Sequence, residues 1–420
     1  MLLSQAFIIL ALLLAVFVLA QLGVALVELG QKLSLAGTVE RQERQLFEQR
    51  LRIAKRRQKQ QENAAPWNGI RKFKIDRVVP ECEGVKSFYL VPHDQKPLPG
   101  FHPGQYLTFE LDIPGQANRV VRCYSLSDRA RPDYYRVTIK RIPAPAGKPE
   151  TRPGLASNFF HAQLKAGDIV DVKAPGGGFY LDVNQSTPVV LLGGGVGLTP
   201  VLSMLNEIVE NAPQRQVWLF YAVRNRAEHI MKETLETIAR ENSNVHLQII
   251  YSKPQEGDEP GRDYHHSGRL NVALLKQQLP SNNFDFYMCG PGEMMSDLTS
   301  GLREWGVPEK SIHLEAFGPA SVKKAEPPLT VGSAPPVFSV TFARAQKESV
   351  WSGQADSLLD LALAEKVPVG YGCRAGNCGT CKTAIKSGKV KHLKEPGCEL
   401  EAGSCLICIC VPESNLVLEA

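Results

Sequence analysis

Residues 372–381 read G-C-R-A-G-N-C-G-T-C, and this stretch is the most informative part of the 420-residue chain. Its cysteines Cys373, Cys378 and Cys381 have the spacing C-x4-C-x2-C, and seven of the ten cysteines follow residue 337. A disulfide-stabilised fold carries cysteines at higher density, whereas clustered cysteines are typical of a metal or cluster site in a reducing compartment. The stretch therefore predicts a compact C-terminal domain organised around a metal centre.

The spacing favours an iron–sulfur cluster over zinc, because zinc sites usually combine pairs of C-x2-C. C-x4-C-x2-C is the spacing of plant-type ferredoxins, which hold a [2Fe–2S] cluster and need a fourth cysteine further along the chain. Gly372, Gly376 and Gly379 would let the loop wrap closely enough for backbone N–H groups to face the sulfides of the cluster. Residues 337–420 thus resemble a ferredoxin domain, and the resemblance implies the α+β fold called β-grasp.

Several cysteines near the C-terminus compete for the fourth ligand position. Residues 406–416 read L-I-C-I-C-V-P-E-S-N-L. This segment resembles the ferredoxin pattern L-x-C-x-x-x-P-x-S-x-L, which selects Cys408. Cys410 is the main alternative, because side chains two residues apart on an extended strand point to the same face.

The overall composition is that of a globular, multidomain protein. Hydrophobic residues make up 43% and charged residues 22%, which excludes a wholly disordered chain and a polytopic membrane protein. The net charge is +5, and residues 31–66 alone hold nine Lys/Arg against four Asp/Glu. The rest of the chain is therefore near neutral, and we expect no nucleic-acid partner.

The N-terminus has the character of a membrane anchor. Residues 1–27 carry no charge and are long enough to cross the hydrocarbon core of a bilayer. A cleaved signal peptide is the alternative, but there is no basic segment at its start. We expect residues 1–30 to be a single transmembrane helix. The basic residues that follow it would place the later domains in the cytoplasm.

Residues 31–66 predict a charged helical stalk. Val39, Leu46 and Ile53 recur every seven residues, which is compatible with a short coiled coil. A solvated helix against anionic lipid headgroups fits equally well, and the sequence leaves both interpretations open.

Three further segments differ in their patterns. Residues 67–185 alternate short β-rich runs, such as 87–91, 105–111, 135–139 and 169–172, with Pro-Gly and Gly-Gly turns, which predicts an antiparallel barrel. Residues 186–318 alternate strands with helices, including a helix near 227–240, which predicts a parallel α/β domain. Residues 319–336 are rich in proline and predict a linker.

The predicted barrel contains R-C-Y-S at residues 122–125, preceded by H-P-G-Q-Y at 102–106 and followed by G-L-A-S-N at 154–158. In this order the three motifs resemble the ferredoxin–NADP⁺ reductase superfamily, whose flavin motif is R-x-Y-S. A half-buried strand tyrosine would explain Tyr124 alone but not all three motifs. The resemblance implies FAD, with FMN less favoured. The implied flavin-binding residues are Arg122 (phosphate), Tyr124 (stacking on the isoalloxazine), Ser125 (hydrogen bond near N5), and Gly154, Ala156 and Ser157 (backbone N–H groups toward the pyrophosphate).

Residues 189–200 read V-V-L-L-G-G-G-V-G-L-T-P, a buried strand, a glycine turn and a helix start. Free backbone N–H groups at a helix N-terminus suit a pyrophosphate. The stretch is not the G-x-G-x-x-G fingerprint, because Leu198 takes the place of its third glycine. It matches the G-G-x-G-x-x-P of the same superfamily. That match implies nucleotide contacts at Gly194, Gly195, Gly197, Thr199 and Pro200.

Two later motifs complete this resemblance. C-G-P at Cys289, Gly290 and Pro291 implies a cysteine near the nicotinamide, and E-A-F-G at 315–318 implies Phe317 over or beside the flavin. Arg224 could pair with a 2′-phosphate, but the surrounding residues lack the rest of the NADPH-selective pattern. NADH is therefore favoured over NADPH, with Tyr124, Ser125 and Cys289 as the catalytic candidates.

Together these features predict a membrane-anchored reductase. They resemble the reductase components of multicomponent oxygenases and of the hybrid-cluster protein, with an anchor added. This implies hydride transfer from NADH to FAD, then single electrons through the cluster to a membrane oxygenase, desaturase or hydroxylase. Direct reduction of quinone or ferric iron, or a redox-sensing module without turnover, are the alternatives. The C-terminal domain has nine Lys/Arg and nine Asp/Glu, so its charge does not identify the acceptor.

Overall fold

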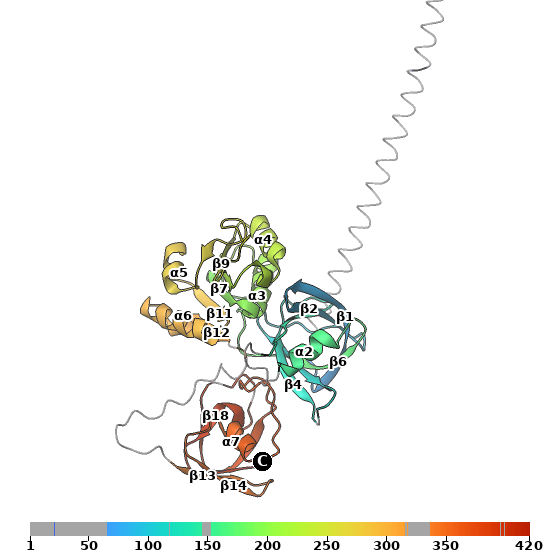
Figure 1. Ribbon diagram of the computed structural model, residues 1–420, viewed down its shortest axis with the longest axis vertical. Coiled ribbons are helices and arrows are strands. Elements are labelled where there is room, and N and C mark those ends of the chain that lie inside the picture. Colours follow the sequence, from blue (N-terminus) through green and yellow to red (C-terminus); the bar gives the residue numbers. More distant parts are fainter. Residues whose placement is uncertain are drawn as a thin grey trace, which may run out of the picture. The chain divides into compact units, whose positions relative to one another are not determined.

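The computed structural model describes residues 65–116, 118–144, 153–315, 317, 337–394, 396–398 and 400–420, together with Gln21 (Figure 1). The chain divides into two compact units, residues 1–62 and 63–420. Apart from Gln21, the predicted anchor lies outside the described residues, as do the stalk up to residue 64 and the linker. Within the described part, no helix combines the length and the apolar character that a membrane crossing needs.

The first domain of the larger unit is an antiparallel β-barrel, as predicted. Its strands follow the order β4-β3-β6-β1-β2-β5, and an antiparallel bridge between Leu126 and Val137 joins the two ends of this order. The helix α2 (Leu155–Ala162) contributes Phe160, which packs edge-on against Phe88 and Phe109 in the barrel core. The strands are β1 (Ile70–Cys82), β2 (Val85–Pro92), β3 (Tyr106–Leu111), β4 (Val120–Ser125), β5 (Tyr135–Lys140) and β6 (Ile169–Gly176).

The second domain has a parallel sheet with the order β10-β9-β8-β7-β11-β12. The strands are β7 (Val189–Gly194), β8 (Val217–Val223), β9 (Val245–Tyr251), β10 (His266–Ser267), β11 (Asp285–Cys289) and β12 (Ile312–Glu315). The strand order reverses between β7 and β11, and ligands of open α/β sheets bind at the carboxyl ends of strands at such a point. Both predicted nucleotide motifs lie there, because one follows β7 and the other follows β11.

Helices cover both faces of this sheet. One hydrophobic core contains residues of α3 (Leu198–Asn211) and α4 (Lys232–Glu241), and the other contains residues of α5 (Val272–Gln278) and α6 (Gly292–Glu304). Short 3₁₀ turns are η1 (Gly195–Gly197), η2 (Arg226–Glu228) and η3 (Glu309–Ser311). The helix predicted near 227–240 begins only at Lys232, because Met231 has a left-handed backbone with a φ of +53°.

The C-terminal domain has the predicted α+β character. Its main sheet has the order β14-β13-β19-β15-β17, and a second sheet pairs β16 with β18. Among the described strands of this domain, β13 and β19 are the one parallel pair. The helix α7 (Leu358–Ala364) begins after Ser357, whose side chain accepts a hydrogen bond from the Asp360 N–H. The other elements are β13 (Phe338–Phe342), β14 (Lys347–Trp351), β15 (Lys382–Ser387), β16 (Val390–His392), β17 (Ser404–Leu406), η5 (Ile407–Ile409), β18 (Cys410–Pro412) and β19 (Leu416–Leu418).

Candidate functional site

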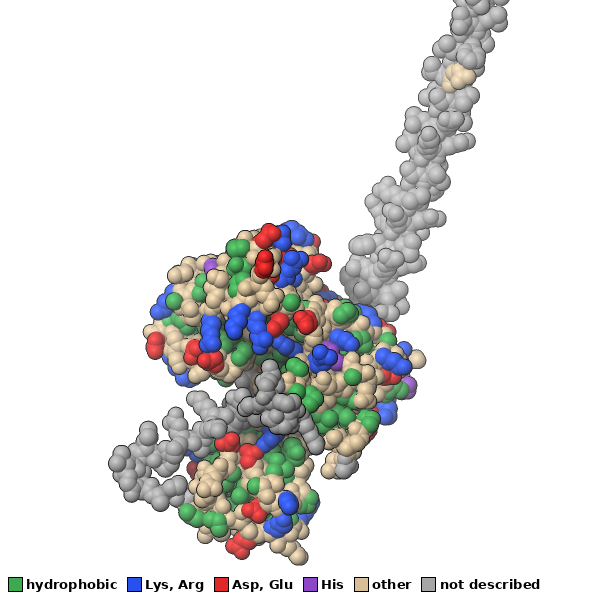
Figure 2. Space-filling model, in the orientation of Figure 1, with side chains coloured by type: hydrophobic (Ala, Val, Ile, Leu, Met, Phe, Trp, Pro, Cys, Tyr) green, Lys and Arg blue, Asp and Glu red, His purple; other side chains and the backbone are tan. Residues whose placement is uncertain are grey.

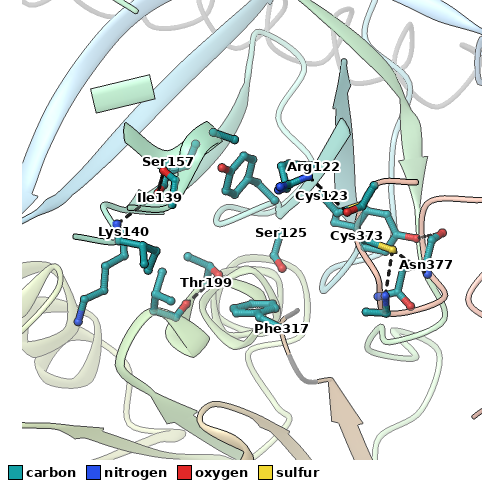
Figure 3. A pocket seen from close by; sticks show the side chains of 18 of the residues that line it. Arg122, Cys123, Ser125, Ile139, Lys140, Ser157, Thr199, Phe317, Cys373 and Asn377 are labelled. Atoms are coloured by element: carbon teal, nitrogen blue, oxygen red, sulfur yellow. Dashed lines mark hydrogen bonds between the residues drawn. The ribbon is translucent and has the colours of Figure 1, made fainter. Parts of the chain in front are cut away.

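A cavity of about 470 Å³ lies where the three domains meet (Figure 3). Residues of the barrel motif R-C-Y-S, of the start of α2, of the start of α3 and of the cluster stretch all border it. Of the predicted site residues, those that border the cavity are Arg122, Tyr124, Ser125, Gly154, Ala156, Ser157, Thr199, Phe317 and Cys373. The fold therefore brings the predicted flavin motif, part of the nucleotide motif and part of the cluster motif to one space.

Strand β4 presents the R-C-Y-S motif to the cavity. The ring of Tyr124 packs edge-on against Phe109 and Phe160, with ring centroids 5.7 and 5.3 Å apart. Burial raises the pKa of Tyr124, so its hydroxyl keeps its proton. The guanidinium of Arg122 donates to the carbonyl oxygens of Val121 at 2.7 Å and Gly372 at 3.3 Å. The motif thus combines a fixed aromatic face with a cation at the cavity.

The loop before α2 is held in place by its own side chains. Ser157 Oγ donates to the Gly154 carbonyl at 3.1 Å and accepts from the Ile142 N–H at 3.2 Å. A Cβ on Gly154 would lie 2.8 Å from Ile142 Cβ, so this position has no room for a side chain. The first turn of α2, with Leu155, Ala156 and Ser157, borders the cavity. Such a helix N-terminus favours an anion.

The two nucleotide motifs pack directly against one another. A Cβ on Gly197 would lie 2.2 Å from the carbonyl oxygen of Cys289, and one on Gly194 would lie 2.8 Å from Pro291 Cδ. At the start of α3, Thr199 Oγ1 donates to the Val196 carbonyl at 3.0 Å. The loops after β7 and β11 are therefore close enough to build one binding surface at the carboxyl edge of the sheet.

Some predicted nucleotide residues lie away from the cavity. Cys289 is fully buried at the end of β11, and burial raises the pKa of its thiol. Gly194, Gly195, Gly197, Pro200, Gly290 and Pro291 likewise do not border the cavity. The side chain of Arg224 follows β8, is 68% exposed and pairs with Glu228 at 3.2 Å.

The cluster stretch wraps around sulfur. The N–H groups of Ala375, Asn377 and Cys378 point at Cys373 Sγ at 3.3–3.4 Å, and the Cys373 N–H points at Cys378 Sγ at 3.3 Å. Gly376 has a φ of +75°, which a residue with a side chain rarely adopts. Hydrogen bonds from Cys123 and Cys373 hold the pKa of Cys378 well below its usual range. Four backbone N–H groups of the loop therefore converge on its sulfur atoms.

The remaining two predicted ligands form a second pair. Cys381 Sγ and Cys408 Sγ are 3.1 Å apart. Cys408 lies in the 3₁₀ turn η5 rather than on an extended strand, so the same-face argument that made Cys410 an alternative does not apply. Cys410 instead pairs with Cys405, and this hydrogen bond and burial raise the pKa of Cys410. The four predicted ligands thus fit a [2Fe–2S] cluster as two pairs, one pair for each iron.

The sequence did not identify Glu315 as a site residue, because it appeared only as the first residue of the motif E-A-F-G. This carboxyl group ends β12, borders the cavity and is only 8% exposed. Burial raises its pKa to about 8, against opposing effects of Lys394 and of a hydrogen bond with Ser125. A charged residue at the end of a buried strand was the signal that could have identified it.

Comparison with known families agrees with this geometry. The chain matches the oxidoreductase FAD-binding domain over residues 73–180, the oxidoreductase NAD-binding domain over 191–300 and the 2Fe-2S iron-sulfur cluster binding domain over 344–413. It is therefore an oxidoreductase with domains for FAD, NAD and a [2Fe–2S] cluster. In this set of domains it is like phthalate dioxygenase reductase. That structure aligns with 84% of this chain and 98% of its own, with a TM-score of 0.52 and 24% identity, which shows a shared fold.

Two other similar proteins match about three fifths of this chain. A flavohemoprotein from Halalkalibacterium halodurans is 36% identical over 254 residues, which are 60% of this chain and 61% of the relative. The FAD/NAD-binding domain of nitric oxide dioxygenase from Vibrio cholerae is 33% identical, with a TM-score of 0.53, and the match covers 59% of this chain and 99% of that one. The chain thus spans about three fifths of the curated relative, so a relative's activity does not transfer with the match.

Proposed function

We propose that this chain is an NADH-dependent reductase that delivers single electrons through its [2Fe–2S] cluster to a protein acceptor, and that its N-terminal segment tethers it to a membrane. The observation that carries the proposal is the single cavity bordered by the flavin motif, the start of α3 and the cluster stretch. A common cavity is what a reductase needs if electrons are to pass from a nucleotide to a flavin and on to a cluster.

The bound cofactors supply the redox chemistry, since FAD accepts a two-electron hydride and can release electrons one at a time to a one-electron cluster. The chain binds and orients them. Arg122 and the N-terminus of α2 would hold the anionic part of FAD. The rings of Tyr124 and Phe317 would cover the flavin, and the hydroxyl of Ser125 would hydrogen-bond to it.

The nucleotide would bind at the carboxyl edge of the parallel sheet. Gly194, Gly195 and Gly197 would let the pyrophosphate approach the backbone, and the N-terminus of α3 would stabilise its charge. Cys289 would fix the position of the nicotinamide end of the site.

The choice between NADH and NADPH depends on Arg224, and Glu228 already pairs with this residue. The guanidinium that could recognise a 2′-phosphate is thereby partly neutralised, which supports NADH over NADPH.

The membrane tether and the acceptor rest on sequence features. The uncharged residues 1–27 and the basic residues after them support a single-pass anchor with the catalytic domains in the cytoplasm. On the face shown in Figure 2, acidic and basic side chains are interspersed over the C-terminal domain. A tether raises the local concentration of a membrane-bound partner. We therefore propose a membrane oxygenase, desaturase or hydroxylase as the acceptor.

An anaerobic titration of the purified, cofactor-loaded protein with NADH tests this function. We expect the flavin absorbance to bleach and the EPR signal of a reduced [2Fe–2S] cluster to follow. Reaction with NADPH but not NADH would reverse the nucleotide preference. No reduction by either nucleotide would leave a redox-sensing module as the better interpretation.

A second experiment tests the tether and the acceptor class. Cell fractionation should find the full chain with membranes and a variant lacking residues 2–27 in the soluble fraction. If both remained soluble, the tether would be wrong. Rapid NADH-dependent turnover with a quinone or with ferric citrate, without any added protein, would favour a direct reductase over a protein acceptor.

A further inference from the structure

Cys123, the variable position of the R-C-Y-S motif, has a place in the structure that its position in the motif does not predict. Its Sγ and the Sγ atoms of Cys373 and Cys378 all lie within 4.8 Å of one another. Figure 3 shows Cys123 and Cys373 side by side at one end of the cavity, with Ser157 and Lys140 at the other end. A thiol of the flavin strand β4 therefore lies against two predicted cluster ligands of the C-terminal domain.

The surrounding contacts fix this approach. Tyr106 Oη donates to the Asn377 carbonyl at 2.7 Å, and Arg122 donates to the Gly372 carbonyl at 3.3 Å. A Cβ on Gly372 would lie 2.9 Å from Val121 Cβ, so the cluster stretch meets β4 with no space for a side chain. Two hydrogen bonds and one close contact thus hold the cluster stretch against the barrel next to Cys123.

Cys123 is not needed as a ligand. The predicted ligands Cys373 with Cys378 and Cys381 with Cys408 would already provide two sulfur atoms for each of two irons. Ligating cysteines are thiolates, which accept hydrogen bonds. A neighbouring S–H group can donate one, although it is a weak donor. Thr108 Oγ1 lies 3.4 Å from Cys123 Sγ, and either atom can be the donor of this hydrogen bond.

A donor to a cluster sulfur favours the reduced cluster. Reduction adds one electron and therefore one negative charge, and hydrogen bonds to the ligand sulfurs are among the groups that set the potential of such clusters. Within the described part of the barrel, Cys82 is the other cysteine, and it lies on β1 beside Lys140 and Glu228 instead. It provides a matched control.

We propose that Cys123 is a positioning residue for the [2Fe–2S] cluster: its S–H group donates to the sulfur of Cys373 and Cys378 across the domain boundary and stabilises the reduced cluster. The flavin-binding strand thereby favours electron arrival at the cluster it faces. The inference rests on the proposed function only for the identity of the cluster. Its tests use dithionite as the one-electron source, so a failure of NADH to react would not affect them.

The experiment compares the full-length, cofactor-loaded wild type with Cys123→Ala, Cys123→Ser and Cys82→Ala. Potentiometric titration followed by EPR should show that Cys123→Ala lowers the equilibrium constant for cluster reduction about tenfold, equivalent to about 59 mV for one electron. Cys82→Ala should match the wild type. Cys123→Ser, which keeps a donor, should fall between the wild type and Cys123→Ala.

A second readout detects the hydrogen bond itself. Proton ENDOR of the reduced cluster should show a coupled proton that exchanges in D₂O in the wild type and in Cys82→Ala, and that is missing in Cys123→Ala. Equal potentials and an unchanged exchangeable proton in Cys123→Ala would overturn the proposal. Loss of iron from both Cys123 variants, with Cys82→Ala fully loaded, would also overturn it, because Cys123 would then be a ligand.

Discussion

The cluster stretch and the cavity beside it are built in different ways. Residues 373–378 supply their own backbone N–H groups to their own sulfur atoms, so the first half of the cluster site is made within six residues. The cavity instead draws its lining from Tyr106 of the barrel, Glu315 of the nucleotide domain and Asn377 of the C-terminal domain. One site depends on local backbone geometry, and the other depends on three domains that pack together.

This difference has consequences for mutation. A change in a locally built site removes a ligand or a backbone turn, and the effect should be close to all-or-none for that cofactor. A change in the shared cavity alters one of several contacts, and the effect should be graded. The predictions below test this contrast, beginning with the largest expected effect.

Replacing Cys408 should abolish the cluster while leaving the flavin in place. Outer-shell partners of a metal typically change affinity about 10- to 100-fold, and loss of a ligand should exceed this. Cys408→Ala should therefore show almost no cluster iron or EPR signal, whereas NADH should still bleach the flavin. Cys410→Ala is the matched control, and we expect it to retain iron. Iron loss in Cys410→Ala with retention in Cys408→Ala would exchange the two assignments.

Gly197→Ala should damage the nucleotide site without a change in any polar group. The new Cβ would lie 2.2 Å from the Cys289 carbonyl oxygen, and overpacking of this kind typically costs about 1–3 kcal/mol. We expect flavin reduction at limiting NADH to slow about 5- to 150-fold. Gly178→Ala has no heavy atom within 4 Å of the new Cβ and should react like the wild type. Equal rates for the two variants would contradict the close packing of the two loops.

The sequence predicted the locally built parts well. The apolar run before the glycine turn became β7, and the short β-rich runs of the barrel became β2, β3, β5 and β6, because each pattern reflects which face of a strand is buried. In the cluster stretch, backbone N–H groups point at the Sγ atoms of Cys373 and Cys378 within a single loop. Local patterns were sufficient wherever the contacts were local.

The parts that sequence reasoning missed depend on distant contacts. Tyr106 and Asn377 are 271 residues apart, and no periodicity in either segment indicates that they meet. Likewise, nothing in the R-C-Y-S motif indicates that Cys123 meets Cys373 and Cys378 of the cluster stretch. Even a local expectation failed where one backbone angle changed the path: Met231 is left-handed, so α4 starts at Lys232.

The pH dependence of stability should reveal that the carboxyl group of Glu315 is buried and protonated. Its pKa of about 8 in the folded protein exceeds the ordinary value of 4.5, so the folded chain keeps a proton that the unfolded chain has lost. Stability from this group is complete below pH 4.5 and falls as pH rises toward 8. Glu315→Gln lacks this component. Melting temperatures of the wild type should therefore decline more steeply than those of Glu315→Gln across this range, and parallel curves would place the carboxyl in water.

Tyr106→Phe is the smallest change and the most direct test of the shared cavity. It removes one hydrogen bond of 2.7 Å between the barrel and the cluster stretch, and a typical hydrogen bond contributes about 0.5–1.5 kcal/mol. If this bond holds the two domains in the arrangement that passes electrons, reduction of the cluster after flavin reduction should slow about 2- to 12-fold. Stopped-flow absorbance separates the two phases.

Tyr135→Phe is the matched control, because it also removes a tyrosine hydroxyl. The hydroxyl of Tyr135 donates to the Pro99 carbonyl at 2.6 Å inside the barrel, so this variant should lower stability and leave the second phase unchanged. A slowed second phase in both variants would mean that barrel stability, and not the domain contact, limits electron transfer. The cavity would then behave as a local site like the cluster stretch.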